Sequence, residues 1–198
     1  RVLCVEESLS LGEDFTRQKD LEEYDLMRLM LGILESSEEL GGQFPLNMLL
    51  QHLNGVSFVK GCYIGQELTQ RTFHTGVIRR VALPFLALSE AASENMQVDR
   101  TNFIPMSHVD KKFDVEIVGE EIRGHVPVKA KEGEEVTKMP KSIKLGKVLC
   151  HKNNCGIALI DITKLDKLGP SAIYKMSDYR LLVWQPAWLE LDMSRQQL

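Results

Sequence analysis

The stretch that decides the fold is "SIKLGKVLCHKNNCGIALIDITKL", residues 142–165. Two runs rich in aliphatic and β-branched residues, 142–150 and 155–165, flank the polar tetrapeptide His-Lys-Asn-Asn. Strand-like runs on either side of a short polar turn are typical of a β-hairpin. The segment therefore predicts two adjacent antiparallel strands.

Other short runs of the same kind surround this hairpin. Residues 76–88 and 113–119 alternate with period two, and further strand-like runs lie at 171–176 and 179–184, separated by Ser-Asp. The polar stretch 89–112 is expected to form a long surface loop. Closely spaced short strands with turn residues between them suggest a small antiparallel barrel or sandwich over residues 76–198.

The periodicity before residue 76 is helical. The segment "DLEEYDLMRLMLGILES", residues 20–36, predicts a helix that begins at a capping box formed by Asp20 and Glu23. Its polar stripe carries Asp25 and Arg28 one above the other. The apolar side chains expected to be buried are Leu21, Tyr24, Met27, Met30, Leu31 and Leu34. A shorter apolar segment at 45–53 ends at Asn54-Gly55, a strong turn signal.

The overall composition narrows the class of protein. With 43% hydrophobic and 26% charged residues among 198, the chain has enough apolar side chains for a packed core. A formal net charge of −4 argues against binding through phosphate neutralisation, and no apolar run approaches the roughly 20 residues of a membrane span. We therefore expect neither nucleic acid nor membrane among the partners. Four cysteines are too few for a secreted disulfide framework and indicate a reducing compartment.

One of these cysteines lies in a chemically suggestive place. In "VSFVKGCYIGQE", residues 56–67, we expect a short strand at 56–59, a turn at Lys60-Gly61 and a helix that starts at 65–67 and runs to about Phe73. Cys62 would then lie within one turn of a helix N-terminus and two residues from an ammonium group, and both features favour a thiolate. The alternative is that Cys62 is a buried small hydrophobe, as isolated cysteines often are.

The neighbours of Cys62 have possible roles of their own. Gly61 and Gly65 leave the backbone open to a ligand, and free N–H groups at a helix start suit an anionic group. Tyr63 could stack on a flat ring or pack against the protein, whereas Glu67 in the first turn could simply complement the helix dipole.

The longer stretch "NGVSFVKGCYIGQELTQRTFHTGVIRR", residues 54–80, closely resembles the signature of the folate-binding YgfZ family. Arg71 and the Gly-Val-Ile-Arg run at 76–79 also match, and the resemblance is strong over residues 44–80 and loose over 90–140. The family core Lys-Gly-Cys-(Tyr/Phe)-x-Gly-Gln-Glu is matched by Lys60, Gly61, Cys62, Tyr63, Gly65, Gln66 and Glu67.

The resemblance implies a fold. The family is similar to the aminomethyltransferase T-protein of glycine cleavage, an α+β fold around a folate cavity followed by a C-terminal antiparallel β-barrel. Residues 1–75 would be the later part of the folate-binding α+β region, and residues 76–198 the barrel domain. Roughly the first half of the family's chain, with much of the folate site, would lie upstream of Arg1.

The resemblance also implies a function. Members act late in iron–sulfur cluster assembly in the mitochondrial matrix. They support the [4Fe–4S] clusters of aconitase and lipoate synthase, with A-type carrier proteins as partners and tetrahydrofolate as a linked cofactor. Cys62 matches the functional cysteine, and the other motif residues would shape its loop and contact folate. Arg28 matches an arginine that faces the folate cavity, although a plain ion pair with Asp25 is the alternative.

Two rival functions stay open at this point. One is a tetrahydrofolate-dependent aminomethyltransferase, but T-proteins lack a cysteine at the position of Cys62. The family also carries the description of a CAF-type transferase, which leaves enzymatic activity open. The other rival is a non-catalytic interaction module in which Cys62 is inert.

The remaining candidate residues favour structural roles. Cys150 and Cys155 flank the predicted hairpin turn, but structural zinc usually needs four ligands in tighter pairs, so we interpret them as strand cysteines. His74 could form a Cys–His couple with Cys62 or cap its helix. Trp184 and Trp188 are expected to close the core of the barrel.

Overall fold

A computed structural model describes residues 21–76, 78–89, 109–125, 142–168 and 172–189. The described elements, in chain order, are α1 (Glu22–Met30), α2 (Ser37–Leu40), α3 (Gln66–Thr75), β1 (Arg80–Leu88), β2 (Glu121–His125), β3 (Ser142–Lys152), β4 (Cys155–Asp161), α5 (Ile162–Leu168), β5 (Ile173–Met176) and β6 (Tyr179–Val183). The mixed α and β content expected from the sequence is confirmed.

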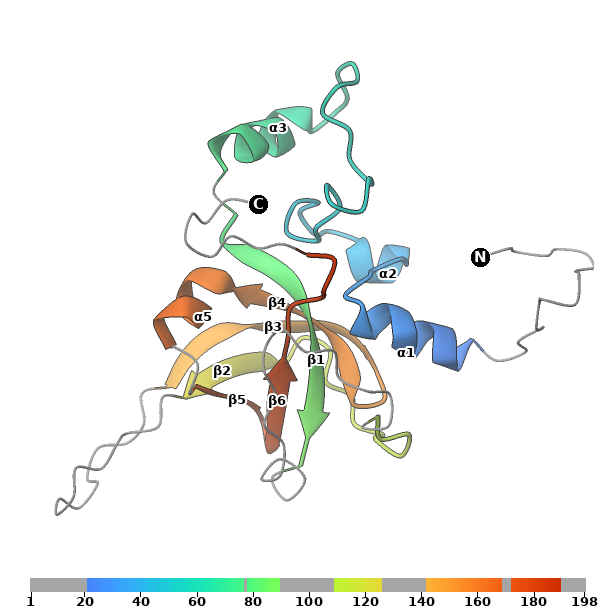
Figure 1. Cartoon of the computed structure of the whole chain (residues 1–198), viewed down its shortest axis with the longest axis vertical. Coiled ribbons are helices and arrows are strands. Elements are labelled where there is room, and N and C mark those ends of the chain that lie inside the picture. The colour runs from blue at the N-terminus through green and yellow to red at the C-terminus, as the bar shows by residue number, and fades with distance from the viewer. Residues whose placement is uncertain (1–20, 77, 90–108, 126–141, 169–171, 190–198) are drawn as a thin grey trace, which may run out of the picture.

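The six described strands close into an antiparallel barrel in the order β1-β4-β3-β2-β5-β6 (Figure 1). The predicted hairpin is confirmed as β3 and β4, with Lys152 opposite Cys155 and Asn153 in the left-handed region at φ 53°. Asparagine tolerates this conformation better than most residues, which explains the turn at Asn153. The second strand ends earlier than predicted, because residues 162–168 turn into α5.

Two predicted strands are wrong. Residues 113–119 run as turns and irregular chain, and only Gly119 and Glu120 exchange backbone hydrogen bonds with Val148 before β2 begins. Residues 56–59 likewise form no strand. In both places an apolar alternation is present, but a strand also needs a neighbour with which to pair. The predicted loop at 89–112 lies mostly outside the described residues.

The strand β1 packs on both of its faces. Val81, Leu83 and Phe85 point into a cluster of buried side chains inside the barrel. Ala82 and Leu86 point the other way, into a second cluster that lies between the barrel and α1. The period-two alternation predicted for residues 76–88 is therefore confirmed from Arg80 onward, with apolar partners on both sides.

The face that α1 presents to the barrel differs in part from the one predicted, because Met30 and Leu34 are buried as expected but other predicted side chains are not. Its buried residues are Leu26, Leu29 and Met30, whereas Leu21 and Met27 are largely exposed. Apolar side chains surround most of this helix, so periodicity alone did not select the face that meets the barrel. Leu21 is the N-cap of α1 and makes no side-chain capping bond, and the capping box predicted at Asp20 lies outside the described residues.

The C-terminal end of α1 is fixed with unusual completeness. Gly32 adopts φ +73°, and the N–H groups of Gly32 and Ile33 donate to the carbonyls of Leu29 and Arg28, which is a Schellman motif. The indole N–H groups of Trp184 and Trp188 donate to the next two carbonyls, Met30 O at 3.2 Å and Leu31 O at 2.7 Å.

The two tryptophans therefore join α1 to the segment after β6. Trp184 belongs to the cluster between α1 and the barrel, so the prediction that it closes the barrel core is wrong for this residue. Trp188 is half-buried and does pack against the interior cluster. The predicted division of the chain at residue 75 stays a prediction, although every described strand lies after that residue. No described helix has the length and hydropathy of a membrane span.

Candidate functional site at an exposed cysteine

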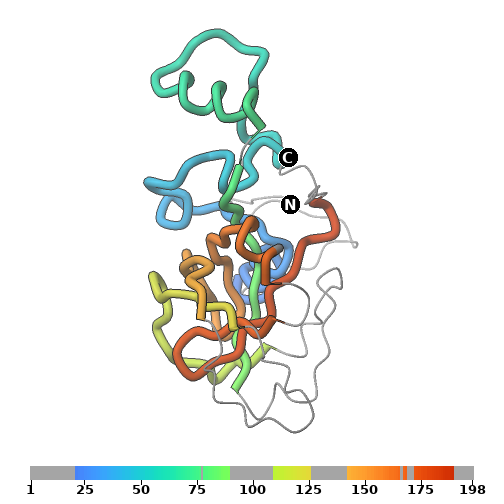
Figure 2. Tube along the Cα trace, turned by 90° about the vertical axis from the view of Figure 1, so that its left-hand side faces the viewer, coloured from blue at the N-terminus to red at the C-terminus, as the bar shows by residue number. Residues whose placement is uncertain are grey.

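Residues 56–76, which we call the cysteine arm, extend away from the barrel in both views (Figures 1 and 2). The arm consists of an irregular loop followed by α3, whose predicted start at the Gly-Gln-Glu triplet is confirmed. Cys62 is exposed and forms no disulfide. It lies three residues before Gly65, the N-cap of α3. The reading of Cys62 as a buried hydrophobe is therefore wrong.

A short hydrogen-bond circuit holds the loop beside Cys62. Gly65 adopts φ +85°, and the N–H of Gln66 donates to Tyr63 O at 3.2 Å. The side chain of Gln66 accepts from the Tyr63 N–H at 3.1 Å and donates to Gln70 Oε1 at 2.7 Å. A residue with a Cβ would be strained at Gly65, so this glycine is needed for the turn.

The aromatic and basic side chains of the arm also contact one another. Lys60 Nζ lies 4.9 Å from the centre of the Tyr63 ring, a cation–π contact across Cys62. Phe58 from the loop stacks on Phe73 of α3, with ring centres 3.8 Å apart and planes at 14°. The first contact lies within the loop and the second holds the loop against α3, and Cys62 stays exposed.

The arm exposes an unusual amount of apolar surface. Val59 is 98% exposed, and Ile64 is fully exposed. The large apolar side chains exposed on the arm are Val59, Tyr63, Ile64, Leu68 and Phe73. Exposed apolar residues gathered around a functional group are typical of interaction surfaces.

The remaining motif residues lie on the same exposed segment. Lys60, Gly61 and Glu67 are exposed, and a Cβ at Gly61 would meet no atom within 4 Å. The structure thus places seven of the eight predicted site residues on the loop and the first turn of α3: Lys60, Gly61, Cys62, Tyr63, Gly65, Gln66 and Glu67. His74 lies in the last turn of α3, edge-on to Phe73, and no described contact joins it to Cys62.

Arg28 is the site residue that the structure places elsewhere. Its guanidinium donates to Asp25 at 3.0 Å, to the Ile33 carbonyl at 3.3 Å, and to both carboxylate oxygens of Glu39 at 2.9 and 2.7 Å. Arg28 and Glu39 have side chains only 12% and 11% exposed. The predicted alternative, an ion pair with Asp25, is therefore present.

This ion-pair cluster shifts the pKa values of Arg28 and Glu39 so that both side chains stay charged. Burial alone would disfavour both ions, but the hydrogen bonds between them raise the pKa of Arg28 and lower the pKa of Glu39. Glu39 also accepts from the N–H of Ser36 while the Ser36 hydroxyl accepts from the N–H of Glu39, which is a capping box at the start of α2. The spacing Ser36-x-x-Glu39 was visible in the sequence and would have identified Glu39.

The other two described cysteines are structural, as predicted. Cys155 is buried, Cys150 is partly buried, and neither forms a disulfide. Burial raises the pKa of each thiol to about 12. Within the described residues, no group of three or more histidine, cysteine or acidic side chains is arranged to bind a metal ion.

Comparisons with known proteins relate the chain to mitochondrial iron–sulfur cluster assembly factors. No family model matches the chain. It is similar to the "Iron-sulfur cluster assembly factor IBA57 homolog, mitochondrial" of Yarrowia lipolytica, with 31% identity over an alignment 183 residues long; the match covers 74% of this chain and 38% of that protein. The human "Iron-sulfur cluster assembly factor IBA57, mitochondrial" is 35% identical over 130 residues, 61% of this chain and 36% of that protein.

A third relative matches over a longer region. The homolog from Dictyostelium discoideum, with the same description as the Yarrowia protein, is 29% identical over an alignment 229 residues long; the match covers 99% of this chain and 55% of that protein. The matched regions thus span between 36% and 55% of the lengths of these three relatives.

Proposed function

Since the chain belongs to the family of these iron–sulfur cluster assembly factors, we propose that it acts in the assembly of mitochondrial iron–sulfur proteins. The single observation that carries the proposal is the exposed, unpaired Cys62 on an arm with little cover from the rest of the protein. A cysteine in such a place is open to another macromolecule, whereas Cys150 and Cys155 are covered.

The proposed role of Cys62 is to hold iron or sulfur in transit as a ligand. A thiol binds iron through sulfur and releases its proton on coordination, and soft sulfur ligands suit iron–sulfur species. A [4Fe–4S] cluster is normally held by four thiolates, so one cysteine must share the cluster with residues of a partner. The exposed apolar side chains around Cys62 would provide the contact with that partner.

The finer points of the proposal come from the family resemblance. We propose that the protein acts late in the mitochondrial matrix, in the maturation of [4Fe–4S] proteins such as aconitase and lipoate synthase. The partners would be A-type iron–sulfur carrier proteins. The region before β1 would belong to an aminomethyltransferase-like fold.

Tetrahydrofolate is proposed as a ligand from the family resemblance. Tyr63 offers a partly exposed ring and Lys60 an ammonium group beside it, which suit a flat pterin and a carboxylate. Arg28 does not fit this role in its present place, because its donors already bind Asp25, Glu39 and a backbone carbonyl. When bound, tetrahydrofolate would supply a carrier for one-carbon groups.

The proposal is tested by complementation. Cells deficient in the gene that encodes this chain would receive the wild-type gene, the Cys62→Ala variant or the Cys150→Ala variant. We expect wild type and Cys150→Ala to restore aconitase activity and protein lipoylation, and Cys62→Ala to fail while its far-UV circular dichroism is unchanged. Cys150 is the matched control because it is also an unpaired cysteine but lies on the barrel.

Normal aconitase activity and lipoylation with Cys62→Ala would defeat the proposed role of this sulfur. In that case the interaction module becomes the better description of the arm. An aminomethyltransferase assay on purified protein, with an aminomethylated lipoyl carrier as substrate, separates the enzymatic rival from both.

A further inference from the structure

Four basic residues form a row across strands β3, β2, β5 and β6 of the barrel. In the strand register, Lys144 of β3 lies opposite Arg123 of β2, Arg123 lies opposite Lys175 of β5, and Lys175 lies opposite Arg180 of β6. Residues that are directly opposite in an antiparallel pair share one face of the sheet. We call these four residues the basic row.

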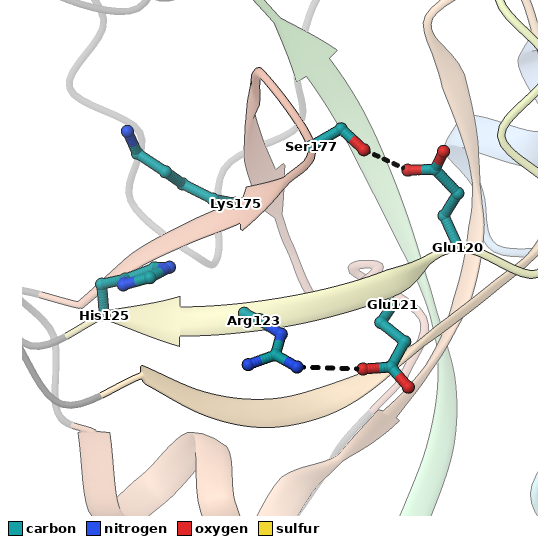
Figure 3. Close-up of a pocket in the computed structure, with 6 residues that line it drawn as sticks. All are labelled: Glu120, Glu121, Arg123, His125, Lys175 and Ser177. Atoms are coloured by element: carbon teal, nitrogen blue, oxygen red, sulfur yellow. Dashed lines mark hydrogen bonds and ion pairs between the residues drawn. The ribbon is translucent and has the colours of Figure 1, made fainter.

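The basic row lies on the outer face of the barrel. The side chains of Arg123 and Lys144 are 54% and 57% exposed. Arg123 and Lys175 also line a depression of about 570 Å³ together with His125 and Ser177 (Figure 3). Strands are spaced by about 4.8 Å, so a row across four strands extends over about 14 Å.

Like charges directly opposite each other destabilise a sheet, so the row costs the fold some stability. Glu121 offsets part of this cost. Its carboxylate pairs with the ammonium group of Lys144, and its Oε2 atom lies 3.5 Å from Nη2 of Arg123. Glu120, the second acidic residue at the depression, accepts from the hydroxyl of Ser177 at 2.7 Å. Lys175 and Arg180 also have interaction partners, so they belong to the basic row because of their register and not because they are unpaired.

We propose that the basic row is a docking surface for an acidic segment of a partner protein. Side chains on one face of an extended peptide repeat about every 6.8 Å, so three carboxylates at alternate positions span about 14 Å and match the row. The site is separate from Cys62 and is independent of the proposed role of that residue.

The acidic residues at the depression favour a peptide over other anions. Glu120 and Glu121 would repel any anion, phosphate or carboxylate, so their charge does not by itself select the ligand. A peptide, however, brings backbone N–H groups, to which these carboxylates can offer acceptors. A depression on a convex barrel suits a narrow chain better than a flat vesicle surface.

The test uses a fluorescein-labelled peptide of eight residues in which glutamate and serine alternate. Its binding to the whole 198-residue chain is measured by fluorescence anisotropy. We expect binding that weakens between about 0.02 and 0.15 M salt, and no binding of the same peptide with glutamine in place of glutamate. The double variant Arg123→Ala/Lys175→Ala should weaken binding about tenfold. The control variant Lys111→Ala/Lys112→Ala, with the same change in net charge at two exposed lysines, should weaken it by about twofold at most.

A third variant tests the sign of the effect. Glu121→Gln removes the carboxylate that occupies Lys144 and Arg123, so it should tighten peptide binding about threefold. Folding is checked by thermal melting, and the single variants Arg123→Gln and Lys175→Gln replace the double variant if it does not fold. Equal binding by the double variant and its control overturns the proposal. Duplex DNA or phosphatidylserine vesicles that bind more tightly than the peptide through the same two residues also overturn it.

Discussion

The barrel with α1 and the cysteine arm are built on opposite principles. On the barrel, β1 buries side chains on both faces and the last carbonyls of α1 are satisfied by backbone N–H groups and two indoles. On the arm, the motif loop is fixed by the side chain of Gln66 and by ring contacts, while large apolar side chains face outward. Stability is thus concentrated in one region and accessible chemistry in the other.

This separation has a physical basis. The role proposed for Cys62 needs an exposed sulfur, and the residues around it then forgo burial, which is the largest source of stability. The barrel supplies that stability instead. A fold divided in this way should tolerate changes on the arm that the barrel does not tolerate.

The largest contrast is expected between two phenylalanines. Phe85 is fully buried in the barrel, so Phe85→Ala should lower the free energy of unfolding by about 3–5 kcal/mol. Phe73 is 41% exposed and contacts the rings of Phe58 and His74, so Phe73→Ala should cost about 0.5–1.5 kcal/mol. Urea denaturation of both variants measures the difference, and equal losses would mean that the arm is as tightly packed as the barrel.

The cysteines offer a second contrast of similar size. Burial raises the pKa of Cys150 and Cys155 from 9.0 to about 12, which lowers their thiolate fraction about a thousandfold near neutral pH. Cys62 is exposed and should be alkylated by iodoacetamide in the native protein, whereas Cys150 and Cys155 should react only after unfolding. Peptide mass spectrometry after timed labelling distinguishes the three sites. Labelling of Cys155 as fast as Cys62 would contradict this contrast.

Sequence reasoning succeeded where the signal was local. The hairpin at Asn153, the start of α3 at Gly65 and the exposure of Cys62 all depend on residues close together in the chain, or on a motif that carries them. It failed at β2, where Glu121 and Arg123 leave only Ile122 as a strong apolar signal. It failed again for residues 113–119, whose alternation is real but lacks a neighbouring strand.

The contacts that sequence reasoning could not supply are those between distant segments. The indole of Trp184 reaches Met30 across most of the chain, and the basic row exists only because strand register places Arg123 beside Lys175. Register between strands that do not follow each other depends on the whole barrel, so no local pattern encodes it. Arg28 shows the same limit, since Glu39 completes its ion-pair cluster from another helix.

The ion pair between Arg28 and Glu39 should contribute an intermediate amount to the free energy of unfolding, and this contribution depends on pH. Glu39→Gln leaves the guanidinium of Arg28 without its bidentate partner and should lower the free energy of unfolding by about 1–3 kcal/mol at pH 7. The folded-state pKa of Glu39 lies below that of an unfolded glutamate, about 4.3, so the unfolded state binds more protons as the solution is acidified. The stability that Glu39 contributes is therefore fully present above about pH 4.3 and is lost as pH falls through the lowered pKa.

The measurement for this effect is urea denaturation of wild type and Glu39→Gln between neutral pH and about pH 3. The difference between the two proteins should shrink as pH falls, since protonation of Glu39 removes in wild type what the substitution removes in the variant. A difference that stays constant with pH would show that the pair is held by packing and not by charge. Glu38→Gln, at an exposed position in the same helix, serves as the control.

The smallest effect on stability is expected at Gln66, although it is the side chain that closes the motif loop. Its bonds to Tyr63 and Gln70 lie at the surface, where water can replace them, so Gln66→Ala should change the free energy of unfolding by about 0.5 kcal/mol or less. The amide of Tyr63 would lose its acceptor, and its hydrogen exchange should become faster while amides of the barrel strands keep their protection. Gln70→Ala is the matched control, because it removes the second bond and leaves the acceptor for Tyr63 in place. If exchange at Tyr63 is unchanged in Gln66→Ala, the loop is held by the contacts of Lys60 and Phe58 instead, and the contrast between a packed barrel and an arm fixed by one amide must be redrawn.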